Sequence, residues 1–230
     1  MKTIIFDIET GPLPEAQLAR MIPPFDPAAV KVGNIKDPGK IAEKIAEAEA
    51  SHVADFTERA ALDATTGRTV AIGCLVFSGM QPCRTLGRAD AEPVILGLNC
   101  EAFLVEEFWK LITNGYTGLN LCIGFNSLAF DLPFLIRRSW ALGVQVPTIL
   151  RNGRYWHDNL IDLRDWWKLG DWQAKGSLDT ISKHFGYAGK NGDGKNFHKL
   201  WETDRVMAEA YLRNDLQMTL AVAQRMNVSI

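Results

Sequence analysis

The sequence predicts an α/β fold in which helices flank a central sheet. Short apolar runs rich in β-branched residues alternate with longer amphipathic segments, and turn residues separate them. The runs at 69–78 and 81–86 follow one another without a helix, so this part of the sheet is expected to be antiparallel. A chain of 230 residues, 47% of them hydrophobic, can bury one sizeable core. We therefore expect residues 1–230 to form a single domain.

The expected strands are runs of Val, Ile, Leu, Cys and Phe that end at turn residues. They cover residues 3–6, 69–78, 81–86, 119–125 and 160–163. The expected helices repeat apolar residues every three or four positions. They cover residues 38–61, 99–113, 130–142, 177–185 and 204–226, with a helical turn at 15–20. Thr10-Gly11-Pro12 is expected to break the first strand, and residues 12–37 and 190–199 to be irregular.

The helix expected at 38–61 lies in an insertion, a loop and helix at about 12–65. Asp37 supplies an N-cap and Pro38 suits the first turn. Two strands joined by a hairpin would need only a few connecting residues. The helix has two interpretations: a solvated face packed against the domain, or a lid or partner surface.

The charged side chains are nearly balanced but unevenly distributed, with 25 Lys and Arg against 27 Asp and Glu. Residues 1–115 carry 11 basic and 16 acidic side chains, whereas residues 116–230 carry 14 and 11. The basic excess of the second half can face a polyanion. It is too small to identify a nucleic-acid binder by charge alone.

The cysteines and the hydropathy indicate a cytoplasmic protein without membrane contact. No run is long enough to span a bilayer, and no basic and then apolar leader is seen. The cysteines are widely spaced and form no C-x-x-C pair, which favours reduced structural thiols over a zinc site. They are Cys74, Cys83, Cys100 and Cys122.

Two acidic residues, Asp7 and Glu9, follow the first apolar run. Residues two apart in a strand point to the same face, which places their α-carbons roughly 7 Å apart. Two carboxylates directed at one spot repel each other, and a hard divalent cation such as Mg²⁺ relieves the repulsion. The alternative is a pair of polar residues at a strand end, one of them facing solvent.

A second acidic element leaves the strand expected at 119–125 and enters the next helix. Gly124 and Asn126 suit a tight backbone, and Asp131 lies near the helix start, where the helix dipole favours a negative charge. This carboxylate is therefore either part of a site or simply an N-terminal helix residue.

A third element, Tyr211 and Asp215, lies in the last helix. Residues four apart share a helix face, so a phenol and a carboxylate are presented together. Such a pair is also common on ordinary helix surfaces. This element alone is therefore a weak signal.

Together the three elements resemble the DEDD superfamily of 3′→5′ exonucleases, which has an RNase H-like fold. The histidine branch would place His at position 210, where this chain has Ala, so the tyrosine branch matches better. The nearest resemblance is to the proofreading-exonuclease-like proteins related to family-B DNA polymerases, and it covers 1–10 and 66–226. The matched residues are Asp7 and Glu9 (D-x-E), Asn126, Phe130 and Asp131 (N-x-x-x-F-D), Tyr211 and Asp215 (Y-x-x-x-D).

The resemblance implies a mixed five-stranded sheet flanked by helices and two Mg²⁺ or Mn²⁺ ions about 4 Å apart. It implies that Asp7 bridges both ions and that Glu9 and Asp215 hold the ion that activates water. Asp131 would act through the outer shell of the second ion, and Tyr211 would orient the water. The implied product is a nucleoside 5′-monophosphate.

Contacts to the terminal nucleotide are expected from residues beside these ligands. They are the Thr10 backbone, Asn126, Leu128 or Phe130 by stacking or packing, and Lys190 at a backbone phosphate.

Further positions have two interpretations each. Lys175 and Lys195 either meet phosphates or are solvated, and Asp162 either supports the site or caps the segment that follows. We expect the tryptophans to belong to the core rather than to a nucleic-acid surface. They are Trp166, Trp167 and Trp172.

The function expected from the sequence is metal-dependent 3′→5′ hydrolysis of single-stranded DNA ends. The partner would be a DNA 3′ end, with a polymerase or another replication or repair protein as a second partner. The alternatives are the same chemistry on RNA, and a catalytically silent nucleic-acid-binding module. Converging like charges disfavour the silent module, since without metal they would repel phosphate.

Overall fold

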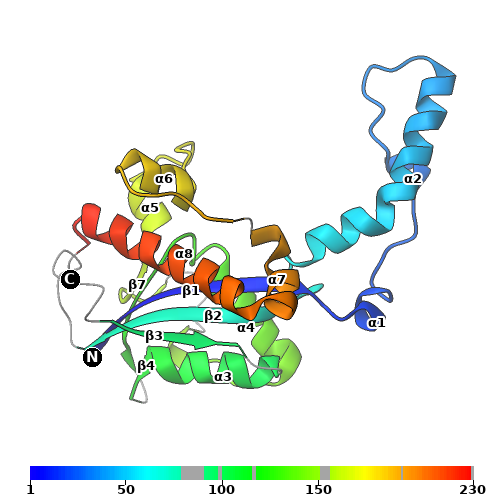
Figure 1. Ribbon diagram of the computed structural model, residues 1–230. Coiled ribbons are helices and arrows are strands. Elements are labelled where there is room, and N and C mark those ends of the chain that lie inside the picture. Colours follow the sequence, from blue (N-terminus) through cyan, green and yellow to red (C-terminus); the bar gives the residue numbers. More distant parts are fainter. Residues whose placement is uncertain (79–90, 98–99, 116–117, 151–155, 193, 229–230) are drawn as a thin grey trace.

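A five-stranded sheet with the strand order β3-β2-β1-β6-β7 forms the centre of the computed structural model (Figure 1). The structure describes residues 1–78, 91–97, 100–115, 118–150, 156–192 and 194–228. Strand β1 pairs antiparallel with β2 and parallel with β6, so the sheet is mixed, as expected. The strands are β1 Lys2–Pro12, β2 Gly67–Ser78, β3 Ala91–Leu96, β6 Leu121–Gly124 and β7 Leu160–Asp162, with a separate pair β4 Thr113–Asn114 and β5 Gly118–Leu119.

Helices cover both faces of the sheet. Helices α3 and α4 pack on one face, and α5, α6 and α8 pack on the other (Figure 1). None of the helices in the described part of the chain is long and apolar enough to cross a membrane. The helices are α1 Glu15–Leu18, α2 Pro38–Ala60, α3 Glu101–Ile112, α4 Asp131–Leu142, α5 Leu163–Lys168, α6 Leu178–His184, α7 Phe197–Thr203 and α8 Arg205–Arg225.

The alternation along β1 decides which way the acidic pair points. Ile4, Phe6 and Ile8 pack into the cluster formed with α3 and α4, whereas Ile5 packs into the cluster formed with α8. Odd-numbered positions of this strand therefore face α8. Residues 7 and 9 are also odd-numbered, so their carboxylates face α8.

The first strand is longer than the sequence predicts. The expected break at residues 10–12 is wrong, because β1 stays paired with β2 as far as Pro12. The register shifts between Glu9 and Thr10, which lets the strand continue through an irregularity. The acidic pair thus lies within a paired strand rather than at its end, and the pairing with β2 fixes its backbone.

Two further expectations concern the irregular segments. The strand expected at 81–86 and Cys83 lie outside the described residues, and the strand that pairs with β2 is β3. The stretch 190–199 is not irregular throughout, since α7 begins at Phe197. Phe197 stacks on Trp201 four residues later and contacts Tyr211, which explains the helical turn.

The expected helix starts are confirmed by their caps. Asp37 accepts hydrogen bonds from the Gly39 and Lys40 amides at the start of α2. Ser177 forms a capping box with Thr180 at the start of α6.

The segment between β1 and β2 forms an arm, residues 13–66, which contains α1 and α2 (Figure 1). Helix α2 extends away from the sheet, and only Ala60 near its C-terminus is buried. The interpretation of α2 as a helix packed against the domain is therefore wrong for most of its length. Inside the arm, His52 of α2 contacts the Phe25 ring and hydrogen-bonds the Pro23 carbonyl.

Gly73 is opposite Asp7 in the β1–β2 ladder and allows α8 to cross the sheet closely. A Cβ atom there would lie 2.8 Å from Leu212 Cγ and 2.9 Å from Leu216 Cδ1.

We expect Gly73→Val to lower the free energy of unfolding by about 1–3 kcal/mol, because packed neighbours must shift. Thermal and urea unfolding would measure this. The control Ser78→Val, at the exposed end of the same strand, should remain near wild type, and equal stability of both variants would contradict the close packing.

Candidate active site

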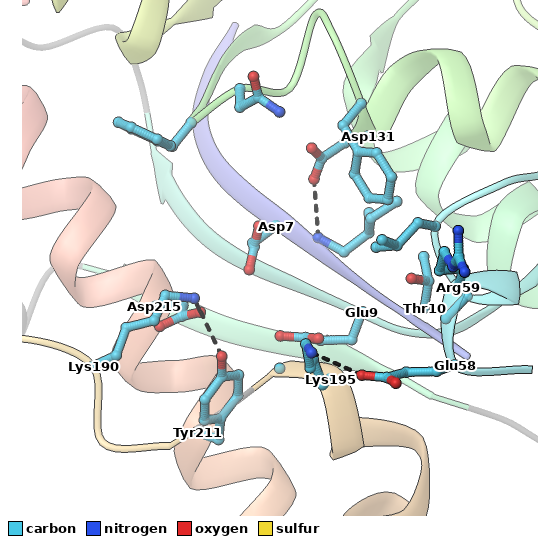
Figure 2. Close-up of a pocket in the computed structure, with 17 residues that line it drawn as sticks. Asp7, Glu9, Thr10, Glu58, Arg59, Asp131, Lys190, Lys195, Tyr211 and Asp215 are labelled. Atoms are coloured by element: carbon cyan, nitrogen blue, oxygen red, sulfur yellow. Dashed lines mark hydrogen bonds and ion pairs between the residues drawn. The ribbon is translucent and has the colours of Figure 1, made fainter. Parts of the chain in front are cut away.

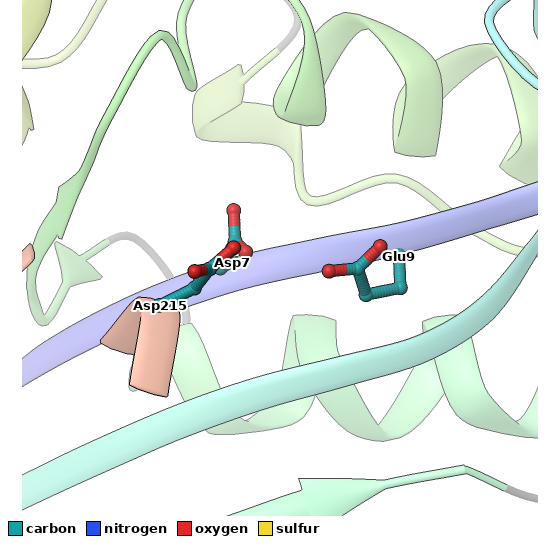
Figure 3. Close-up of side chains that lie close together, drawn as sticks. All are labelled: Asp7, Glu9 and Asp215. Carbon is teal, nitrogen blue, oxygen red and sulfur yellow. The ribbon is translucent and has the colours of Figure 1, made fainter. Parts of the chain in front are cut away.

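Three carboxylates from two distant parts of the chain converge above the centre of the sheet. Asp7 and Glu9 project from β1, and Asp215 projects from α8 (Figure 3). One carboxylate oxygen from each lies within 4.8 Å of the others. This is the arrangement that the resemblance to the exonuclease superfamily implies, and it is made of oxygen donors only.

Asp215 is the most enclosed of the three, with 1% of its surface exposed. Its Oδ2 atom accepts a hydrogen bond from Lys190 Nζ at 2.6 Å. Its Oδ1 atom is buried and has no hydrogen-bond partner among the described residues. A buried acceptor without a partner is costly, so this oxygen is available to a ligand of the site.

Asp131 lies at the first position of α4, as expected, and faces the same cavity (Figure 2). Its Oδ1 atom accepts a hydrogen bond from the Ile8 amide at 3.2 Å, across to β1. It is not a member of the group of three whose oxygens lie within 4.8 Å. The fourth carboxylate is therefore set slightly apart from the other three.

Asp162 fixes the loop that leads to α4. Its carboxylate accepts hydrogen bonds from the amides of Asn126 and Leu128 at 2.8 and 2.9 Å. It also caps α5 by accepting from the Arg164 amide. Asp162 therefore both fixes the loop that contains Asn126 and caps the helix that follows it. Asn126 adopts a positive φ of 61°, a conformation that Asn tolerates better than most residues.

Tyr211 and Lys190 meet at the edge of the cluster (Figure 2). Lys190 Nζ lies 3.2 Å from the Tyr211 hydroxyl oxygen and also approaches the face of the ring. The loop between α6 and α7 comes close to the phenol, because a Cβ on Gly192 would lie 2.9 Å from its ring. A hydrogen bond from the Lys190 amide to Asp179 ties the same loop to α6.

Burial and crowding raise the pKa values of the carboxyl groups. Burial and the nearby charge of Asp215 raise the pKa of Asp7 to about 7. Burial and Asp7 likewise raise the pKa of Glu9 and that of Asp131. Burial also raises the pKa of Asp215, although the Lys190 ammonium opposes the shift. The site therefore holds more negative charge than its surroundings neutralise.

The basic and phenolic groups keep their protons. Burial lowers the pKa of Lys190, but the attraction of Asp215 outweighs it and the net shift is upward. Burial and Asp215 raise the pKa of Tyr211, so its hydroxyl remains a donor at neutral pH.

The carboxylates lie in a cavity of about 540 Å³ (Figure 2). Thr10, Asn126, Phe130 and Lys190 line it, as the expected substrate contacts require. Leu128 does not line it, and instead packs against the core formed with α3 and α4. The remaining lining residues are Ile8, Glu58, Arg59, Ala61, Leu62, Phe125, Gly194 and Lys195, besides the carboxylates and Tyr211.

The sequence did not reveal that the base of the arm forms one wall of the cavity. Glu58, Arg59, Ala61 and Leu62 line it, and Glu58 forms an ion pair with Lys195 at 2.7 Å. The interpretation of this helix as a lid or partner surface comes nearest to this result. Periodicity could identify the helix but not the contact, because the contact joins segments that are 137 residues apart.

Two other expectations are corrected or extended. Trp166 and Trp172 are exposed rather than part of the core, and only Trp167 packs inward, against Phe185. Lys175 is exposed and does not line the cavity. Arg164, which the sequence did not single out, donates a hydrogen bond to the Asn126 side chain at 2.6 Å.

The donor set fits a hard divalent cation. The ligands are carboxylate oxygens, one of them is a buried acceptor without a partner, and β1 and α8 hold the like charges close together. A divalent cation would relieve both the unsatisfied acceptor and the repulsion. Among the described cysteines, Cys74 and Cys122 are buried and Cys100 is exposed, and the group of carboxylates contains no cysteine.

Comparisons with known proteins identify the family and the fold. The sequence model of a family described as a predicted 3′–5′ exonuclease related to the exonuclease domain of PolB matches residues 60–229. The fold is similar to that of the family B DNA polymerase from Pyrobaculum calidifontis, with a TM-score of 0.59 and 16% sequence identity. The match covers 98% of this chain and 24% of the polymerase, so the chain spans about a quarter of that protein. No protein of curated function matches the chain.

The raised carboxyl pKa values predict how stability depends on pH without metal. Asp7 titrates near 4 when unfolded and near 7 when folded, so its contribution is present below about pH 4 and is lost as the pH rises to about 7. We expect Asp7→Asn to raise the melting temperature in EDTA at pH 8 and to reduce the difference between pH 5 and pH 8. Thermal unfolding at both pH values measures this. Asp158→Asn, an exposed carboxyl outside the cavity, is the control. A less stable Asp7→Asn protein at pH 8 would contradict the assigned crowding.

Proposed function

Because this chain belongs to the family of predicted 3′–5′ exonucleases related to the exonuclease domain of PolB, we propose that it hydrolyses the 3′ end of single-stranded DNA. The reaction would be metal-dependent and release nucleoside 5′-monophosphates. The observation that carries the proposal is the convergence of Asp7, Glu9 and Asp215 in one cavity. A site that bound phosphate without metal would need positive charge at this position, and here it has carboxylates.

The proposed cofactor is Mg²⁺ or Mn²⁺, two ions per site, held by Asp7, Glu9 and Asp215 with Asp131 in an outer position. Bound divalent ions would lower the pKa of the attacking water and stabilise charge on the leaving 3′ oxygen. The protein supplies the ligands on rigid elements, since β1 and α8 are both packed into the core.

Tyr211 is proposed to orient the attacking water through its hydroxyl. The raised pKa keeps this hydroxyl protonated at neutral pH, so it can donate a hydrogen bond as well as accept one. The ring is held between Phe197 of α7 and the ammonium group of Lys190. A fixed donor of this kind contributes by positioning rather than by covalent chemistry.

The terminal nucleotide is proposed to occupy the cavity beside these groups. Thr10, Asn126 and Phe130 line its wall, and Asn126 is held in place by Arg164. Lys190 would meet the phosphate once its interaction with Asp215 is relieved. Leu128 retains a role only through packing, since it does not reach the cavity. A polymerase or another replication or repair protein is the proposed partner.

The first test is cleavage of a 5′-labelled single-stranded DNA in the presence of Mg²⁺. We expect a ladder of products that shortens from the 3′ end, and no cleavage by Asp7→Ala, because one ligand of the proposed ions is lost. Denaturing gels of matched DNA and RNA strands measure direction and preference. Faster cleavage of RNA would replace the DNA proposal, an uncut strand would support the silent binding module, and normal activity of Asp7→Ala would refute the assigned site.

Tyr211→Phe tests the proposed orientation of the water. We expect kcat to fall by about ten- to hundred-fold, because a positioned hydrogen bond is lost while the carboxylates remain. Single-turnover cleavage measures the rate, and the rise in melting temperature on adding Mn²⁺ reports ion binding separately. Ion binding should be retained. Loss of the Mn²⁺ effect would instead assign the tyrosine to the ion site.

A further inference from the structure

Three large apolar side chains are exposed together on α5 and the turn that follows it. Trp166 is 42% exposed, Leu169 is 90% exposed and Trp172 is 83% exposed. Large apolar groups clustered at the surface of a protein often mark a binding site. The cavity, the group of carboxylates and the motifs described above do not account for them.

The turn that carries these side chains is held in a fixed conformation. Trp167 packs inward against His184 and Phe185, and its indole nitrogen donates to the Lys175 carbonyl at 2.9 Å. The Asp171 amide donates to the Lys168 carbonyl, which folds the turn back on α5. The outward position of Trp166 and Trp172 is therefore a consequence of the packing of their neighbour, not of a loose chain.

Leu169 adds a second observation from the backbone. It caps α5 with a positive φ of 48°, a conformation in which Gly or Asn is far less strained than Leu. The chain thus places a branched apolar side chain where neither helix capping nor burial favours it. A ligand that covers this side chain would explain the choice.

Helix α5 begins next to a residue that lines the cavity. Arg164 in the first turn of α5 donates to the side chain of Asn126, which lines the cavity. At 1.5 Å per residue, Trp166 and Leu169 lie about 3 and 8 Å further along the helix axis. The three exposed side chains thus follow closely along the chain from the residue that contacts the cavity wall.

The chemistry of the segment fits a ligand with flat apolar groups and is compatible with a polyanion, although Lys168 is paired with Asp165 at 3.2 Å. Residues 163–176 carry three basic side chains and two acidic ones, and Lys175 is exposed beside the turn. An indole ring can stack on any base, because every base has an aromatic face. The acidic and basic residues that flank the tryptophans are Arg164, Asp165, Lys168, Asp171 and Lys175.

We propose that Trp166, Leu169 and Trp172 form an accessory surface that binds the unpaired bases of a single strand whose 3′ end lies in the cavity. This inference rests on the proposed function, since it uses the same substrate and adds a second contact to it. It assigns to the surface a role in holding the strand rather than in cleavage.

Binding of a fluorescein-labelled oligothymidylate in EDTA tests the surface without cleavage. We expect Trp172→Ala to weaken binding roughly ten-fold, and Trp166→Ala with Trp172→Ala to weaken it further, because stacked bases lose their partners. Trp172→Phe, which keeps an aromatic face, should restore most of the affinity. The matched control is Trp140→Ala, since Trp140 is 70% exposed but lies near the end of α4, outside the surface. Fluorescence anisotropy measures each dissociation constant.

A second measurement separates this inference from the proposed function. The p-nitrophenyl ester of thymidine 5′-monophosphate has no second base, so wild type, Trp172→Ala and Trp140→Ala should hydrolyse it alike with Mn²⁺. Hydrolysis of the ester with oligonucleotide binding unchanged in Trp172→Ala would overturn the surface and leave the function standing. Binding that depends on Trp172 without hydrolysis by wild type would support the surface and count against the function.

Two further outcomes overturn the surface. If wild type self-associates in sedimentation experiments and Trp172→Ala is monomeric, the surface is a contact between copies of this chain. If wild type binds no oligonucleotide at all, the surface has no role in holding a strand.

Discussion

The central constraint on this molecule is the repulsion among carboxylates gathered in a buried place. Asp7, Glu9 and Asp215 share one pocket, with Asp131 beside them. Burial penalises each charge, and each charge penalises the others, which is why the pKa values rise together. A fold tolerates such a cluster only where rigid elements hold it. Such clusters of perturbed groups are more frequent at functional sites than elsewhere.

Ordinary packing features of the fold bring these carboxylates together. The two-residue period of β1 sends the apolar side chains of Ile4, Phe6 and Ile8 to one face and leaves the other for the acidic pair. Gly73 leaves room for α8 directly across from that pair. The crossing helix then brings Asp215 over the sheet. The position of the site thus follows from packing, and its chemistry follows from which residues occupy three positions.

The local rules of the sequence predicted these features well where one element decides the outcome. The side-chain alternation of β1, the Asp37 and Ser177 caps and the pairing of Tyr211 with Asp215 depend on neighbours a few residues away. The prediction was poorer where distant segments decide. The continuation of β1 to Pro12 depends on its partner strand, and α6 decides that Trp167 packs inward while Trp166 and Trp172 are exposed. The spacing of residues alone does not contain these contacts.

The ammonium group of Lys190 stands where the cluster most needs positive charge. It gives the folded protein an internal counter-charge, unlike small zinc domains, which are unfolded without their metal. Part of the negative charge of the cluster is thus compensated by a side chain of the protein itself. The loop that carries this lysine is tied to α6 through Asp179. One loop, fixed to a neighbouring helix, therefore compensates part of the charge that the first strand and the last helix bring together.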